Sequence, residues 1–251
     1  MSEKPRLRER RMPRSRVDTH NNRAKKRSGQ GLTGLTEIRD TQWREFFARP
    51  TIEVARGLIG ATVLRVIPKS ALDAGGLVAG RIVETEAYLP LVDPACHAYR
   101  GPTKRTAGMF GWPGKAYVYF IYGMYNCLNV TTEPAGIGGA VLIRALEPTR
   151  GLDLMRNRRR KGTPDALLAR GPGNLCRALG VDTSLNGIDL HSGELMLELA
   201  KSDRTTPIAV GPRVGIKVAP RWPLRFADAN SASVSNPRKN LRLLCAASDS
   251  I

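Results

Sequence analysis

Residues 116–132 read "AYVYFIYGMYNCLNVTT", an apolar stretch with four of the chain's six tyrosines. Aromatic and β-branched residues favour β-strands, in which successive side chains point to opposite faces of the sheet. Tyr117 and Tyr119 would therefore share one face of a strand. Tyr122 and the glycine after it break the alternation, so we expect Tyr122 to be exposed at a turn. The chain is only 6% aromatic, so this concentration of rings needs an explanation.

Strands and helices are also predicted on both sides of this stretch. Short β-rich segments occupy residues 61–67, 76–89, 138–148, 193–200 and 207–219. Helical patterns cover 41–49, 51–60 (with Thr51 as a possible cap), 149–162 and 171–180. No internal repeat is found. The sequence predicts one mixed α/β (α+β) domain over residues 41–230, a disordered basic arm over 1–40, and a C-terminal tail over 231–251 that trails along the surface or is disordered.

The charge of the chain points to a polyanionic partner. Lys and Arg number 40 against 22 acidic residues, a formal charge of +18. Residues 1–30 carry +8 of this, which leaves +10 for residues 31–251. Nucleic acid is the first candidate and an anionic membrane surface the second. The arm is interpreted as an electrostatic nucleic-acid contact, with a solubilising tail or a targeting peptide as alternatives.

No run approaches the roughly 18 apolar residues of a spanning helix, and no secretory signal follows the start, so we expect an intracellular protein that does not bind membranes. We expect it to be cytoplasmic and nucleoid-associated in a bacterium, or nuclear in a eukaryote.

Cysteines and histidines do not indicate a metal site or a disulfide framework. They are widely spaced and include no C-x-x-C pair: Cys96, Cys127, Cys176, Cys245, His20, His97 and His191. We therefore expect reduced thiols, no metal and no cofactor.

Candidate chemistry lies on the strand "RIVETEAYL", residues 81–89. The period of two places Glu84, Glu86 and Tyr88 on one face, where one carboxylate could act as a general base. A solvated strand face with a salt partner is the alternative. Arg144 follows five residues of predicted buried strand, so it should meet a carboxylate or a phosphate rather than water, and a structural ion pair is its simplest interpretation.

A basic loop containing His97 lies between the acidic strand and the tyrosine stretch. Its "GPTK" lacks the spacing of a phosphate-binding loop, and a lone histidine is most often a packing or surface residue. The tyrosines could be core residues, whose hydroxyls then need buried partners. In a basic protein they could instead stack on bases, which is worth about 1–3 kcal/mol per base. Rings, positive charge and a buried acid together suggest chemistry on a nucleobase.

Six segments in order resemble the alkyladenine (3-methyladenine) DNA glycosylase family: "RIVETEAYL", "DPACHAYRG", "GMFGWPGKAYVYFIYGMYNCLNV", "AVLIRALEP", "GPGNLCRALG" and "RVGI" with "PLRF". The resemblance runs from about Phe46 to Phe226. It implies a curved, mainly antiparallel sheet with surrounding helices, similar to the C-terminal-domain-like fold of transfer-RNA formyltransferases. It also implies a monomeric, monofunctional enzyme that flips alkylated or deaminated purines out of double-stranded DNA and hydrolyses the N-glycosidic bond.

The resemblance also implies a role for individual residues. Glu86 would activate water and Arg144 would help to hold it. The other implied positions are Tyr88, His97 and Tyr119 stacking on the base, Tyr122 intercalating in the duplex, Asn129 excluding normal guanine, and Met109, Tyr117, Lys104 and Arg105 supporting DNA binding. No lysine matches a pocket motif, so a Schiff-base mechanism is not expected.

Two other classes of function are weighed against the glycosylase. A non-catalytic nucleic-acid-binding module could use the tyrosines as a stacking platform, but it does not explain Glu86 and Arg144. A formyltransferase-type domain shares the implied fold, but it does not need the E-T-E-A-Y motif. Cationic 3-methyladenine is the expected substrate, with 7-methylguanine next. Hypoxanthine and ethenoadenine are neutral and need protonation of the leaving base.

Overall fold

The computed structural model describes residues 41–69, 75–200, 206–236 and 238–244. The predicted basic arm lies outside these ranges, as does Cys245. The described residues belong to one compact unit that spans Asp40–Ile251.

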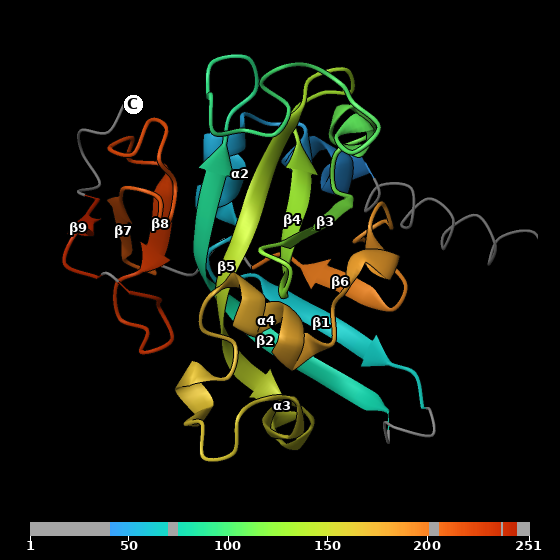
Figure 1. Cartoon of the computed structure of the whole chain (residues 1–251), viewed down its shortest axis with the longest axis vertical. Coiled ribbons are helices and arrows are strands. Elements are labelled where there is room, and N and C mark those ends of the chain that lie inside the picture. Colours follow the sequence, from blue (N-terminus) through green and yellow to red (C-terminus); the bar gives the residue numbers. More distant parts are fainter. Residues whose placement is uncertain (1–40, 70–74, 201–205, 237, 245–251) are drawn as a thin grey trace, which may run out of the picture. The chain divides into compact units, whose positions relative to one another are not determined.

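An antiparallel sheet forms the centre of this unit (Figure 1). Its strands are β1 (Thr62–Ile67), β2 (Gly76–Tyr88), β3 (Ala116–Ile121), β4 (Tyr125–Thr132), β5 (Gly139–Arg150), β6 (Leu195–Glu198), β7 (Ile208–Gly211), β8 (Arg225–Asp228) and β9 (Arg242–Leu243). They pair in the order β3-β4-β5-β2-β8-β7-β9, while β1 pairs with both β2 and β6. The mixed α/β fold with a mainly antiparallel sheet is therefore confirmed.

The helices pack on this sheet through apolar faces. Residues 41–47 are helical, followed by α2 (Thr51–Gly57), α3 (Leu152–Arg158) and α4 (Pro172–Leu179), with short 3₁₀ turns at η1 (Ala107–Phe110), η2 (Asp165–Leu167) and η3 (Thr183–Leu185). Val54 and Leu58 from the α2 segment share one core with Leu128 of β4 and Leu175 of α4. This continuous core fixes α4 against β4 and β5.

The N-terminus of α2 differs in detail from the prediction. Pro50, not Thr51, is the N-cap residue. The Thr51 hydroxyl instead donates to Glu133 Oε1 at 2.6 Å, and its backbone N–H donates to the same carboxylate. The side chain of Glu133, 82 residues away, therefore accepts from the first backbone N–H of the helix, and no local pattern in the sequence could indicate this contact.

The tyrosine stretch folds as the hairpin β3–β4. Ile121 pairs with Tyr125, so residues 122–124 form the turn. Tyr122 has φ of 55°, in the left-handed region that non-glycine residues rarely adopt, and Gly123 follows with φ of 67°. The predicted break at Tyr122 is confirmed.

The strands β2 and β5 contain a local irregularity where the two glutamates lie. Their register shifts on both sides of Glu84, which pairs with Ala145, whereas Thr85 pairs with Ile143. Val83 and Arg144 are thereby left without a direct ladder partner. Bulges of this kind re-aim side chains and are common beside active sites.

The chain after β7 differs most from the sequence prediction. β8 inserts between β2 and β7, and Ser231, Ser233 and Ser235 are buried, although we expected residues 231–251 to trail along the surface or to be disordered. Short strands and contacts made through the backbone leave no hydrophobic periodicity in the sequence. The burial of residues 227–236 could therefore not be predicted.

Candidate active site

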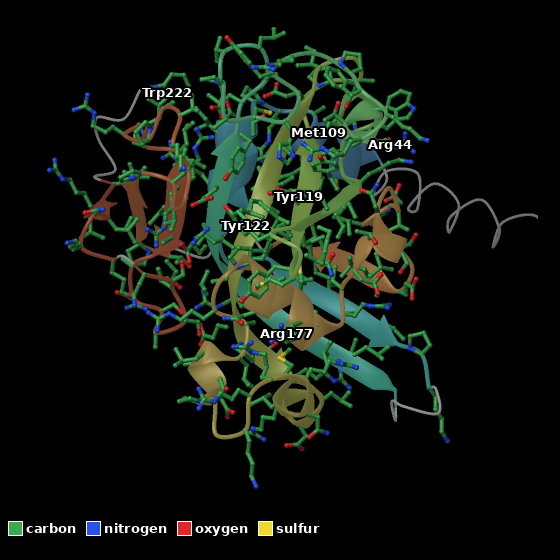
Figure 2. The ribbon with its side chains drawn as sticks, in the orientation of Figure 1. Arg44, Met109, Tyr119, Tyr122, Arg177 and Trp222 are labelled. Carbon is green, nitrogen blue, oxygen red and sulfur yellow. The ribbon has the colours of Figure 1, made fainter. Side chains whose placement is uncertain are left out.

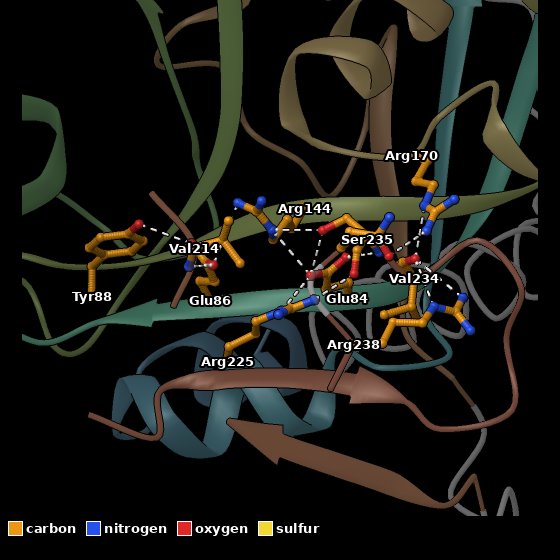
Figure 3. A network of polar contacts seen from close by, with 11 residues as sticks. Glu84, Glu86, Tyr88, Arg144, Arg170, Val214, Arg225, Val234, Ser235 and Arg238 are labelled. Atoms are coloured by element: carbon orange, nitrogen blue, oxygen red, sulfur yellow. Dashed lines mark hydrogen bonds and ion pairs between the residues drawn. The ribbon is translucent and has the colours of Figure 1, made fainter. Parts of the chain in front are cut away.

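Two carboxylates lie at the centre of the sheet because β2 has β5 on one side and β8 on the other. Glu84 and Glu86 are both 0% exposed, so the alternative of a solvated strand face is wrong. A buried carboxylate is costly unless charges and hydrogen bonds compensate it. Arg144 on β5 and Arg225 on β8 supply two positive charges for the two negative ones (Figure 3).

Glu84 is surrounded by donors. Its Oε1 accepts from Arg225 Nε at 2.6 Å and from the Ser235 hydroxyl at 2.9 Å, and Arg144 Nε lies 3.1 Å away. Its Oε2 accepts from the Ser235 backbone N–H at 2.7 Å. Glu84 is therefore a saturated counter-ion, facing protein on all sides.

Glu86 has a different environment. Its Oε1 accepts from the Val214 backbone N–H at 2.7 Å and lies 3.5 Å from Arg144 Nη1, and its Oε2 accepts from the Tyr88 hydroxyl at 3.0 Å. Burial raises the pKa of Glu86, against the opposing effects of Arg144, the Val214 N–H and the Tyr88 hydroxyl, while Glu84 adds to the rise. A carboxylate with a raised pKa is a stronger base when it is ionised.

A cavity of about 420 Å³ opens beside Glu86. Glu86, Arg144 and Leu142 line it from the sheet, and the N-terminal turn of α4 with the loop after β7 completes it: Gly171, Pro172, Gly173, Asn174, Val214, Gly215 and Ile216. A volume of this size suits a small organic group such as a purine.

Aromatic side chains form the walls of this cavity. Tyr88 on β2, His97 on the following loop and Tyr119 on β3 all line it, so the structure brings the predicted stacking residues together. The centroids of His97 and Tyr119 lie 4.7 Å apart in an edge-on arrangement. Burial lowers the pKa of His97, with a smaller contribution from the charge of Arg105, so its imidazole is neutral at neutral pH.

A second, much smaller cavity of about 20 Å³ continues the first. The two share Tyr88, Ala95, His97 and Tyr119, and the small one reaches Asn129. The Asn129 amide donates to the Tyr117 backbone carbonyl at 2.9 Å, which fixes its side chain at the lining of this small cavity.

Met109 and Tyr117 line the same small cavity and are both buried. The Tyr117 hydroxyl lies 3.0 Å from His97 Nδ1. The resemblance assigns Met109 and Tyr117 to minor-groove or pocket-supporting positions, and their burial favours support of the pocket.

Tyr122 lies at the rim of the large cavity and is 75% exposed (Figure 2). Phe120 and Met124 beside it are also exposed. Lys104 and Arg105 are exposed on the loop before η1 and do not line either cavity. The hairpin turn thus presents a ring to the outside, next to the entrance of the pocket.

Sequence reasoning missed several residues of the site. Arg213 forms a buried ion pair with Asp93, donates to the Ala87 carbonyl at 3.0 Å, and lies 4.6 Å from the centre of the Tyr88 ring. Neither the spacing nor the family resemblance predicts a role for Tyr125 beyond packing, yet Tyr125 lines the large cavity and packs on Gly173, where an added Cβ would lie 2.5 Å from the Tyr125 ring. The "RVGI" motif marked Arg213 and Val214 in the sequence without indicating their contacts.

The described part of the chain holds no group of three or more His, Cys, Asp or Glu side chains that could bind a metal. Cys96, Cys127 and Cys176 are buried free thiols. Across the described ranges, we find no helix whose length and apolar character would let it cross a membrane.

Comparison with known proteins identifies relatives over the same region. The model of the methylpurine-DNA glycosylase family matches residues 45–232. A protein of Methanocella arvoryzae named "Putative 3-methyladenine DNA glycosylase" is 48% identical over 196 residues, which cover 76% of this chain and 94% of the relative. Proteins of the same name from Rhodopseudomonas palustris (47% over 197 residues, 78% and 88% covered) and Frankia casuarinae (45% over 205 residues, 77% and 92%) are similar in extent.

Proposed function

The chain belongs to the methylpurine-DNA glycosylase family, and we propose that it flips alkylated purines out of double-stranded DNA and hydrolyses their N-glycosidic bond with water activated by Glu86. It is a 3-methyladenine DNA glycosylase, a hydrolase of N-glycosyl bonds that acts on DNA. The observation that carries the mechanism is the buried Glu86 beside Arg144, at the wall of a cavity lined by aromatic rings.

Glu86 and Arg144 would act together on the attacking water. Departure of the base leaves positive character on the sugar, which an ionised Glu86 stabilises while it accepts the water proton. General-base help of this kind contributes about 10²–10⁴ in rate. Arg144 Nη1 lies 3.5 Å from Glu86 Oε1, and it would hold the water and favour the ionised carboxylate.

The walls of the cavity would bind the flipped base. A purine alkylated at N3 or N7 is cationic, so it is both a better leaving group and a better partner for electron-rich rings. Tyr88, Tyr119 and a neutral His97 offer such rings without adding a positive charge that would repel the base. Selectivity for 3-methyladenine, and then 7-methylguanine, follows from the charge of the lesion.

Asn129 would reject normal guanine. Its amide is fixed by the bond to the Tyr117 carbonyl, so it cannot rotate away from an exocyclic amine that enters the small cavity. The exposed Tyr122 would fill the gap that the flipped base leaves in the duplex, offsetting part of the few kcal/mol that flipping costs.

We propose that the enzyme acts as a monomer in the compartment that holds the DNA, either nucleoid or nucleus. Basic residues near the pocket, such as Lys104 and Arg105, would contact phosphates. No cofactor takes part in this scheme.

Release of free base from a duplex containing 3-methyladenine tests the proposal. Wild type should release base, Glu86→Gln should not, and the exposed β6 variant Glu198→Gln should match wild type. Glu86→Gln should still bind a duplex with an abasic analogue. Equal release by Glu86→Gln and wild type would refute the mechanism. If wild type binds DNA but releases no base, the alternative of a non-catalytic binding module is favoured.

A further inference from the structure

The proposed mechanism uses Glu86 and Arg144 but leaves a second buried cluster without a role. Glu84, Arg225 and Ser235 lie directly behind Arg144 and are all buried (Figure 3). Stability alone does not explain a buried ion pair, because well-packed apolar residues at the same positions often give a protein that is at least as stable. The position of the cluster suggests a function for it.

We propose that Glu84 and Ser235 are positioning residues, which fix the guanidinium of Arg144 so that its Nη1 faces Glu86 and the cavity. This inference rests on the proposed function. Neither residue touches the cavity, so neither contacts the base or the water. They act through Arg144.

The contacts of Arg144 support this arrangement. Its Nε donates to the Ser235 hydroxyl at 3.1 Å and lies 3.1 Å from Glu84 Oε1. The Ser235 hydroxyl in turn donates to the same carboxylate oxygen at 2.9 Å. Ser235 and Glu84 thus hold the Nε side of the guanidinium, while Nη1 lies 3.5 Å from Glu86 Oε1. Because guanidinium is planar, fixing Nε fixes the direction of the remaining donors.

Backbone contacts hold Ser235 in place. The carbonyl of Val234 accepts from Arg170 Nε at 3.0 Å and from Arg238, and the Ser235 carbonyl accepts from Arg225 Nη2 at 2.8 Å. Arg238 also donates to the Ser231 carbonyl at 2.7 Å. Arginine side chains therefore tie residues 231–236 as a strap behind Arg144. Ser235 lies beyond residue 232, where the family match ends.

Ser235→Ala removes the hydroxyl between Glu84 and Arg144 while it keeps the backbone bond to Glu84. Ser233→Ala is the matched control, because Ser233 is also buried on the same strap and its hydroxyl has no hydrogen-bond partner. In single-turnover release of 3-methyladenine, Ser235→Ala should be about 10- to 100-fold slower than wild type, the factor for one hydrogen bond to a charged group. Ser233→Ala should equal wild type, and Ser235→Thr should restore the rate.

A second readout distinguishes positioning from general damage. Affinity of Ser235→Ala for a duplex with an abasic analogue should be unchanged. If affinity falls as far as the rate does, or if Ser235→Ala and Ser233→Ala release base equally fast, the inference is wrong.

A measurement without turnover keeps the inference separate from the proposed function. The Arg144 Nε–H resonance, assigned by its disappearance in Arg144→Lys, should be more strongly protected from solvent exchange in wild type and Ser233→Ala than in Ser235→Ala, in which only the contact with Glu84 at 3.1 Å remains. Equal protection in both serine variants would overturn the inference even if the enzyme released no base. A wild type without base release would, by itself, remove only the proposed function.

Discussion

Tyr122 combines an unfavourable backbone with an exposed ring, so its replacement should affect stability and DNA recognition differently. The left-handed conformation at φ of 55° costs a non-glycine residue about 1–2 kcal/mol. Glycine removes this strain but loses about 0.5–1 kcal/mol in entropy on folding. Tyr122→Gly should therefore raise the free energy of unfolding by roughly 0.5 kcal/mol, and Tm by about 1–2 °C for a domain of this size.

Tyr122→Ala should leave stability within about 0.5 kcal/mol of wild type, because the ring is exposed and alanine inherits the strained backbone. Both variants remove the ring that would fill the emptied stack. One stacked ring is worth about 1–3 kcal/mol, so affinity for a duplex with an abasic analogue should fall about 5- to 150-fold. Affinity for undamaged duplex should change far less, because no gap is present there to fill.

Fluorescence anisotropy on the two duplexes, together with thermal unfolding, measures both effects. Phe120→Ala is a suitable control, since Phe120 is an exposed ring on β3, just before the turn that holds Tyr122. It should leave the ratio of the two affinities unchanged. Equal weakening on both duplexes in Tyr122→Ala, or an unchanged affinity for the abasic duplex, would refute the role of Tyr122 as the intercalating ring.

Three further predictions concern the pocket and the arm. Base release should rise with pH and level off above the pKa of Glu86, since the ionised form is the active one in the proposed mechanism. The midpoint should lie above the ordinary glutamate value of 4.5, because burial raises this pKa. A rate already at its plateau at pH 4.5 would contradict this prediction. Gly173→Val should slow base release and weaken lesion binding, because a Cβ there would lie 2.5 Å from the Tyr125 ring. Gly108→Val is the control for a β-branched side chain, because Gly108 has open space around it. Equal activity of the two variants would show that the α4 turn does not shape the pocket. Deleting residues 1–30 should reduce the slope of log affinity against log salt by about 0.9 for each phosphate that the arm neutralises, and an unchanged slope would make the arm a solubilising tail.

Much of the sheet could be predicted, because β2 to β5 are long strands with alternating or continuous apolar residues. The turn at Tyr122 could also be predicted, because a glycine follows this residue. The strands β8 and β9 have four and two residues and, unlike the equally short β6, do not lie within a longer alternating segment. The bulge around Glu84 could not be predicted either, because it depends on how β2 and β5 meet rather than on either strand alone.

The same distinction holds for the site. Glu86, Arg144 and the aromatic walls lie on strands and motifs that the sequence makes visible. Ser235 does not, because it acts through a hydroxyl and a backbone N–H in an irregular segment 151 residues from Glu84. Arg213 and Asp93 lie 120 residues apart, so their ion pair is likewise a product of the fold.

The two glutamates of the E-T-E-A-Y motif have the same side chain but different surroundings, and this difference can give them different roles. Both are wholly buried on one strand, yet Glu84 accepts hydrogen bonds from Arg225 and Ser235 with protein on every side, whereas Glu86 borders the cavity with Arg144 at 3.5 Å. Two carboxylates whose surroundings differ in this way can take separate roles. Glu84 neutralises the arginines, and this leaves the Arg144 charge only partly available to Glu86. A full ion pair would lower the basicity of Glu86, so in the proposed mechanism the shared arginine would keep its carboxylate both ionisable and reactive toward water.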